Sequence, residues 1–152
     1  MKSSFAFLLV LASLATGCHT PATVPPLNLA EPDWQVLHGQ AVWRPSRAAK
    51  EIAGELFIAT HPDGRSLVQF TKTPLLLVSA QTSAKRWRVQ FPREKVFEGG
   101  GAAPTRVVWL HLAKVIAGVP PPSRLTWEPH QDGTWKLEND RTGEMLEGFV
   151  AP

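Results

Sequence analysis

The sequence has little of what usually builds a disulfide framework or a membrane span. Its 152 residues include one cysteine and no tyrosine. The single cysteine, Cys18, leaves no disulfide to form within the chain, so burial of apolar side chains must stabilise the fold. The apolar run from Phe5 to Leu14 is shorter than the about 20 residues that a transmembrane helix needs. A disulfide-framed domain is therefore excluded, and a spanning helix is not expected.

Motifs of metal and nucleophilic chemistry are also missing. The sequence has no His-x-x-x-His pair, no cysteine cluster and no Gly-x-Ser-x-Gly elbow. Gly99-Gly100-Gly101 lacks the Lys-Ser/Thr of a phosphate loop and indicates a flexible hinge. The histidines are scattered along the chain: His19, His38, His61, His111 and His130. We expect no catalytic residue, no metal site and no cofactor, although chain order alone does not exclude a small hydrolase.

The acidic residues are explained first by turns and by solvent. We expect Asp63, Asp132 and Asp140 in turns, and we expect the outer faces of late strands to carry Glu128, Glu138 and Glu144. A glycosidase needs two carboxyl groups facing each other across a cleft. The sequence neither shows nor excludes such a pair.

The first 17 residues have the order of a secretory signal. Lys2 precedes the apolar run, and small residues follow it. Leu14-Ala15-Thr16-Gly17-Cys18 resembles the lipobox of bacterial lipoproteins, in which the cysteine is acylated and becomes the first residue. We therefore predict a signal peptide over 1–17 and lipidation of Cys18. The alternatives are an ordinary signal peptide and a buried free cysteine.

Residues 18–32 are predicted to form a tether behind this anchor. Pro21, Pro25 and Pro26 prevent a continuous helix. An extended tether at about 3.1 Å per residue would hold the domain on the order of 40 Å from the lipid. Alternatively, residues 27–29 begin a short element that packs on the domain. His19 stands where aspartate signals inner-membrane retention in some lipoproteins, so we expect the periplasmic face of the outer membrane.

Residues 33–152 are predicted to form a single β-rich domain. The chain is 43% apolar and contains 14 prolines, which favours short strands over long helices. The formal charge of +3 includes Lys2, and so small an excess of base predicts no nucleic-acid partner. We expect a monomer.

Period-two alternation bounded by turn residues predicts most of the strands. Within 86–91, Trp87, Val89 and Phe91 share one face. Glycines at Asp63-Gly64, Asp132-Gly133 and Thr142-Gly143 indicate tight turns. The predicted strands are 34–43, 52–60, 66–72, 75–81, 86–91, 125–131, 134–139 and 144–150.

One segment has helical spacing instead. Apolar residues recur with this spacing between Thr105, which can cap a helix start, and Gly118, which can end it. The predicted fold is therefore mainly β (α+β). It is a curved antiparallel sheet of roughly seven or eight strands that forms an unclosed half-barrel, with one helix packed on its concave face.

Two stretches have both a structural and a functional interpretation. Lys85, Arg86, Arg88 and Arg93 form either a solvated strand face or a surface for lipid head groups or lipid A phosphates. Leu75-Leu76-Leu77 indicates either a strand buried on both faces or an apolar loop tip or cavity lining that meets acyl chains.

The order of elements resembles the LolA/LolB family of outer-membrane lipoprotein carriers and receptors. The resemblance covers roughly 34–150 and rests on the Trp-x-x-x-x-Gly strand at 34–39 and on the segment Trp109 to Leu137. That segment has Trp-Leu, then Ala-Gly-Val-Pro-Pro-Pro, then Asp-Gly and Trp135. The resemblance implies an unclosed barrel around an apolar cavity for acyl chains. It also implies a membrane or cargo loop at Leu75 and Leu76.

These observations lead to three functional hypotheses. The first is a non-enzymatic, lipid-anchored envelope protein that binds acyl chains or lipoproteins in its half-barrel, for delivery to the outer membrane. The second is a scaffolding lipoprotein with a filled core and an outward binding face, and the third is a small hydrolase. For the first hypothesis, we expect the cavity to be lined or flanked by Trp87, Val89, Phe91, Val108, Leu112 and Ile116.

Overall fold

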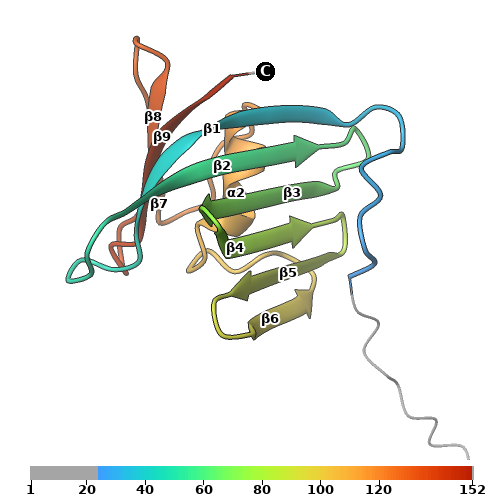
Figure 1. The fold of residues 1–152 in the computed structure, drawn as a ribbon, viewed down its shortest axis with the longest axis horizontal. Coiled ribbons are helices and arrows are strands. Elements are labelled where there is room, and N and C mark those ends of the chain that lie inside the picture. Colours follow the sequence, from blue (N-terminus) through green and yellow to red (C-terminus); the bar gives the residue numbers. More distant parts are fainter. Residues whose placement is uncertain (1–23, 152) are drawn as a thin grey trace, which may run out of the picture.

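The computed structural model describes residues 24–151, which form one antiparallel sheet of nine strands with one helix against it (Figure 1). The elements in chain order are β1 (Gln35–Arg44), β2 (Ile52–Thr60), β3 (Ser66–Lys72), β4 (Leu75–Thr82), β5 (Arg86–Phe91), β6 (Lys95–Gly100), α2 (Trp109–Ile116), β7 (Leu125–Pro129), β8 (Thr134–Asn139) and β9 (Met145–Ala151).

The strand order is β6-β5-β4-β3-β2-β1-β9-β8-β7. Within the described residues β6 and β7 are the two edges, so the sheet does not close into a barrel. Strands β1 to β6 pair in chain order, and so do β7 to β9. The two groups join where β9 pairs with β1. The predicted fold class, a curved unclosed antiparallel sheet with a single helix, is confirmed.

The sheet bends sharply where small residues meet across three strands. Ala41 of β1 is paired with Gly54 of β2 on one side and with Gly148 of β9 on the other. A Cβ atom at Gly54 would lie 2.6 Å from the carbonyl oxygen of Thr71, and one at Gly148 would clash with the backbone of Gln40. This row of small residues lets β1 and β2 curve toward β9 (Figure 1).

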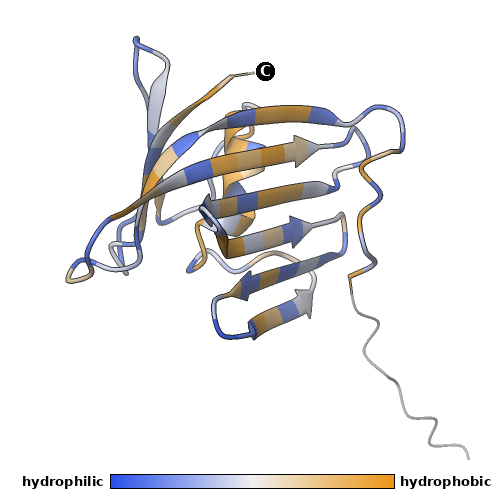
Figure 2. Cartoon of the chain, in the orientation of Figure 1, coloured by the Kyte–Doolittle hydropathy of each residue, from blue (hydrophilic) through white to orange (hydrophobic). Residues whose placement is uncertain are grey.

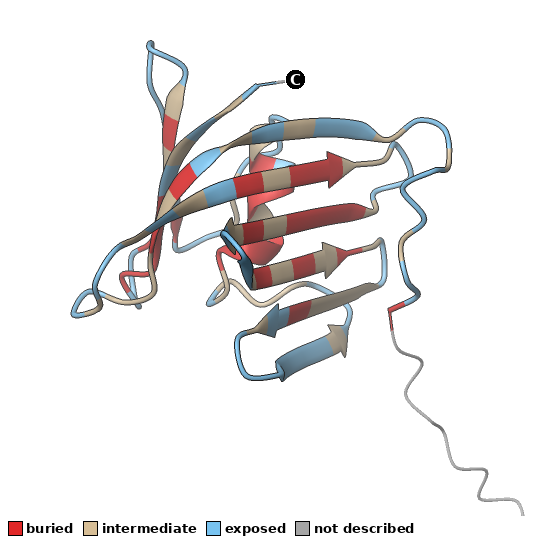
Figure 3. Ribbon diagram, viewed as in Figure 1, coloured by how far each residue is buried: buried red, intermediate tan, exposed pale blue. Residues whose placement is uncertain are grey.

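The core lies between α2 and the inward face of the central strands. Burial alternates along most of β4, whereas the central strand β3 begins with three buried residues in a row (Figures 2 and 3). The largest side chains that are almost completely buried include Trp109, Phe70, Leu56, Ile58, Leu112 and Leu137. The space beneath α2 is therefore filled with side chains.

Two predicted features of the segment before the helix were wrong. Gly99 and Gly100 belong to strand β6 instead of a hinge, because Gly99 leaves room for the indole ring of Trp87, which lies where its Cβ would be. The helix begins at Trp109, after the N-cap residue Val108, and Thr105 does not cap it. The strand count was low because β6 has too little apolar character to be recognised.

The N-terminal part of the described chain packs on the turn between β2 and β3. The Arg65 guanidinium contacts the Glu31 carboxylate at 2.8 Å and the Asp63 carboxylate at 2.7 Å, and it lies over the Trp34 ring. Val24 is buried. Residues 24–34 thus contact the domain, as the alternative for 27–29 predicts, although they form neither a helix nor a strand.

The predicted signal peptide, Cys18 and the first part of the tether lie outside the described residues.

Candidate ligand-binding cleft

An apolar cleft of about 480 Å³ opens beside the core, at the β5–β6 edge of the sheet. It lies between this edge, the end of β1, the loop 101–108 and the turn that leads into β9. Its lining residues are Trp43, Pro45, Trp87, Phe91, Phe97, Pro104, Arg106, Val107, Thr142 and Glu144. Most of these side chains are aromatic or aliphatic, as in sites for small apolar ligands.

Four aromatic rings form the wall on the sheet side. The rings of Trp43 and Phe91 are stacked with their centroids 6.1 Å apart, and Phe97 meets Phe91 edge to face at 6.3 Å. Trp87 packs over Gly99, which has no side chain to displace it. Trp43 is buried at the inner end of the cleft, whereas Phe97 is 49% exposed on β6. The wall therefore runs from the core to the solvent.

The opposite wall is the loop before α2, which side-chain hydrogen bonds hold in place. The Asn139 amide nitrogen donates to the carbonyl of Thr105 at 2.7 Å. His111 Nε2 lies 3.2 Å from the carbonyl oxygen of Pro104, to which it donates when that nitrogen carries the proton. Burial lowers the pKa of His111. The loop is thus fixed to both β8 and the helix, and its side of the cleft is preformed.

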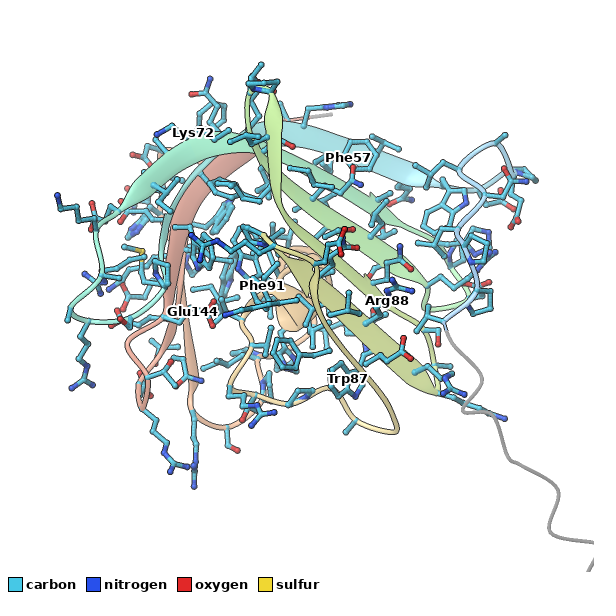
Figure 4. All side chains as sticks on the ribbon, turned by 60° about the horizontal axis from the view of Figure 1, so that its bottom comes forward. Phe57, Lys72, Trp87, Arg88, Phe91 and Glu144 are labelled. Atoms are coloured by element: carbon cyan, nitrogen blue, oxygen red, sulfur yellow. The ribbon has the colours of Figure 1, made fainter. Side chains whose placement is uncertain are left out.

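A buried carboxyl group lies at the inner end of this cleft. Glu144 is only 7% exposed, and its Oε1 accepts a hydrogen bond from Trp43 Nε1 at 3.1 Å. Its Oε2 accepts the backbone N–H of Val108 at 3.3 Å. Burial raises the pKa of the Glu144 carboxyl to about 7, and the two hydrogen bonds oppose this rise. Figure 4 shows Glu144 and Phe91 near each other, from two parts of the chain that the fold brings together.

Sequence reasoning placed Glu144 incorrectly. It was expected on the outer face of a strand, but it lies inside because the tight turn at Gly143 directs the chain back under the loop before α2. Asp63 and Asp132 do serve their turns, since each accepts the backbone N–H two residues later. The sequence signal for Glu144 is weak: a glutamate between a glycine turn and the apolar pair Met145-Leu146.

The predicted cavity residues separate into three groups. Trp87 and Phe91 line the cleft. Val89, Val108 and Leu112 are completely buried core residues and line no cavity, because the helix packs directly on the strands. Ile116 borders only a small pocket at the other end of α2. Sequence reasoning missed Trp43 and Phe97 as cleft residues, since alternation predicts a face of the sheet and not what covers it.

The Leu75-Leu76 pair lies at the hairpin between β3 and β4. Leu75 is 62% exposed and Leu76 is 48% exposed. The interpretation of this segment as a strand buried on both faces was therefore wrong. Leu77 is half-buried and joins the core, so the strand re-enters the domain within two residues. The hairpin presents two adjacent leucines to the surroundings.

The basic stretch shows the predicted alternation. Arg86 and Arg88 lie on the face of β5 opposite to Val89, and Arg88 lines a polar depression with Val24 and Pro26 (Figure 4). This face is solvated and is partly covered by the N-terminal segment. A role in contacting lipid head groups stays a prediction.

Within residues 24–151 no group of three or more His, Cys, Asp or Glu side chains could hold a metal ion. None of the helices in this part of the chain is long and apolar enough to cross a membrane. No protein-family model matches the chain, and a comparison with curated proteins gives no significant match.

Proposed function

We propose that this protein is a lipid-anchored envelope protein that binds acyl chains of lipids or lipoproteins in the cleft beside its β5–β6 edge. The observation that supports this most directly is the cleft itself. Its volume of about 480 Å³ lies within the range of about 300–1,000 Å³ that is typical of small-molecule sites. Its wall of aromatic rings offers apolar surface to the acyl chain of a ligand.

Burial of apolar surface would supply the affinity. Each Å² of apolar surface removed from water contributes about 25 cal/mol. The cleft is open along the sheet edge, where Phe97 is half exposed. An acyl chain can therefore enter it without unfolding of the core. The filled space beneath α2 offers no room, and the proposed site is therefore the edge cleft and not the predicted cavity under the helix.

The Leu75-Leu76 hairpin is the proposed contact with a membrane or with cargo. Two exposed leucines in adjacent positions gain free energy when they enter an apolar environment. The hairpin lies at the end of β3 and β4 opposite to the turn that packs on residues 24–34 (Figure 1). Delivery of lipid or lipoprotein to the outer membrane, as in the carrier and receptor family that the sequence resembles, is the role that we infer.

Anchoring through Cys18 is the second part of the proposal. One acyl chain binds a membrane only marginally, whereas two or more give stable attachment. Intact mass measurement of the chain expressed in a bacterium should show loss of residues 1–17 and the added mass of acyl groups. The Cys18→Ala variant should lack that mass. An unacylated native chain would refute the anchor and leave the cleft proposal standing.

Ligand binding is tested with a chain that begins at His19, because it keeps the whole described domain. Native mass spectrometry of this chain, purified without detergent, should show copurified acyl ligands. Phe97→Glu, which charges the mouth of the cleft at a half-exposed position, should abolish them. Phe149→Glu is the matched comparison, since Phe149 is 45% exposed on the opposite face. Equal loss in both variants, or no ligand in the parent chain, would refute the proposal.

The scaffolding hypothesis is the second candidate, and one observation favours it. A second hollow of about 460 Å³ lies on the outer face, at the bend of the sheet, and Phe149, Val42 and Thr134 contribute to its lining. This hollow, with the filled core, suits an outward binding face. Loss of binding to an envelope partner in Phe149→Glu but not in Phe97→Glu would support it. The hydrolase hypothesis finds no support in the cleft, whose lining contains neither Ser, His nor Asp.

A further inference from the structure

Glu144 is a buried titratable group that the binding of an acyl chain does not use. The residue is only 7% exposed, yet it borders the cleft. Both oxygens accept a hydrogen bond, but among residues 24–151 no Lys, Arg or His forms an ion pair with it. Buried carboxylates are normally paired with a cation, because an isolated charge is costly to remove from water.

The surroundings of Glu144 are those that recognise an ammonium group. Trp43, Phe91, Trp87 and Phe97 line the same cleft, and the faces of such rings attract cations, most strongly when water is excluded. A carboxylate behind aromatic rings combines an ion pair with cation–π attraction. An apolar acyl chain alone would leave Glu144 without a cationic partner whenever its carboxyl group is ionised, which with a pKa of about 7 is increasingly the case above neutral pH.

We infer that the cleft selects a ligand whose apolar body carries an ammonium group, which is held against Glu144 and the aromatic wall. This inference rests on the proposed function, because the apolar body occupies the same cleft as the acyl chain. It adds the chemical class of the polar end. A primary amine and the head group of an ethanolamine lipid both supply that chemistry.

Arg106 is the feature of the cleft that opposes this inference. It lines the mouth and would attract an anion. Its side chain is exposed, however, so water screens its charge far more than the charge of Glu144. The two residues therefore make opposite predictions about the preferred ligand, and they can be separated by experiment.

The test compares three ligands that share a decyl chain and differ in charge: decyltrimethylammonium, decanol and decanoate. Binding to the chain that begins at His19 is followed by calorimetry and by tryptophan fluorescence, to which Trp43 and Trp87 of the cleft contribute together with the other four tryptophans. The cation should bind about tenfold more tightly than decanol, which corresponds to one ion pair with cation–π contacts. Glu144→Gln should remove this preference, so that this variant binds the cation no more tightly than it binds decanol.

Two further variants keep the test decisive. Glu128→Gln removes the same charge from an exposed position on β7 and should keep the cation preference. Phe97→Leu keeps an apolar side chain at a half-exposed site but removes one ring, and it should weaken the binding of the cation more than the binding of decanol. It reports on the cleft even if Glu144→Gln fails to fold.

The outcomes distinguish the two proposals. Failure of all three ligands to bind refutes the acyl-binding function. Binding of all three with equal affinity, or tightest binding of decanoate with loss in Arg106→Gln, retains that function and overturns the ammonium inference. If the cation is preferred, decylamine is compared with a lysophosphatidylethanolamine that carries a decanoyl chain. Tighter binding of the lysolipid identifies a lipid head group as the source, and tighter binding of decylamine identifies a free amine.

Discussion

The centre of the sheet and its β5–β6 edge both carry apolar side chains, but apart from Val89, which is completely buried, those of the edge are less buried than those of the centre. In the centre, Phe70 of β3 and Val78 of β4 are completely buried. At the edge, Phe91 is half-buried and Phe97 is half exposed. Figure 3 shows this change from buried strands to the exposed β6. Alternation therefore determines which face is apolar, and something else determines whether that face is covered.

The length of α2 accounts for the difference. A helix of eight residues is about 12 Å long, which is too short to cover a curved sheet of nine strands. It packs on β2, β3, β4 and β5, with most contacts to β3. Of the cleft wall, Trp43 still meets Trp109 of α2, with 5.6 Å between the ring centroids, whereas the ring contacts of Phe91 and Phe97 are with Trp43 and with each other. The cleft is thus the part of the concave face that the helix leaves open.

The largest effect should come from removing a ring in the covered centre. Phe70→Ala should lower the free energy of unfolding by about 3–5 kcal/mol, because the ring packs 5.2 Å from Trp109 and leaves a cavity. Phe97→Ala at the edge should cost about 1 kcal/mol or less, since its ring is half exposed. Urea unfolding followed by tryptophan fluorescence measures both. Similar losses would mean that the edge is packed as tightly as the centre.

The second largest effect should be a pH dependence of the free energy of unfolding, which arises from Glu144 in the cleft. Its pKa is raised to about 7 in the folded protein, against about 4.3 in an unfolded chain. The folded state therefore binds more protons between these values, and stability falls as the pH rises through this window. The fall should be on the order of 3 kcal/mol, and it is complete above pH of about 7.

Glu144→Gln should lack this fall, since an amide does not titrate there. Unfolding free energies at several pH values from 4 to 8 measure the difference between the two curves. Glu128→Gln, at an exposed position, should follow the parent chain. If the unfolding free energy depends on pH in the same way in the parent and in Glu144→Gln, water reaches Glu144. The description of Glu144 as a buried carboxyl group with a raised pKa would then be wrong.

Much of the fold follows from the sequence because period-two alternation and glycine turns are local signals. The hairpin at Asp63-Gly64 and the helix near Trp109 depend on neighbours within a few residues. The cleft does not, since it depends on where the helix ends in space and on contacts between distant residues. Glu144 meets Trp43 across 101 positions of sequence. No local pattern encodes such a contact, and for this reason the site residues were predicted only in part.

A smaller effect should come from adding a methyl group in the covered centre. In Gly54→Ala the new Cβ would lie 2.6 Å from the Thr71 carbonyl oxygen and 2.8 Å from the Phe70 ring. Neither a paired backbone nor a packed ring can move freely, so we expect a loss of about 1–3 kcal/mol in urea unfolding. Ala53→Ser, at the exposed neighbouring position, should change stability by about 0.5 kcal/mol or less. A neutral Gly54→Ala would contradict the tight bend.

Adding a methyl group at the β5–β6 edge should lower the free energy of unfolding least, and it should instead move a side chain of the cleft. In Gly99→Ala the new Cβ would lie 2.7 Å from Trp87 Cζ2, but this ring is half-buried and can rotate toward solvent. Because alanine also loses less backbone entropy than glycine, the net change should be about 1 kcal/mol or less. Tryptophan emission should shift as Trp87 moves. Gly100→Ala is the matched control, since its Cβ would meet only the Lys85 carbonyl at 3.8 Å and should leave the emission unchanged. If Gly99→Ala instead costs as much as Gly54→Ala, Trp87 is held as rigidly as the core, and the edge differs from the centre in exposure alone.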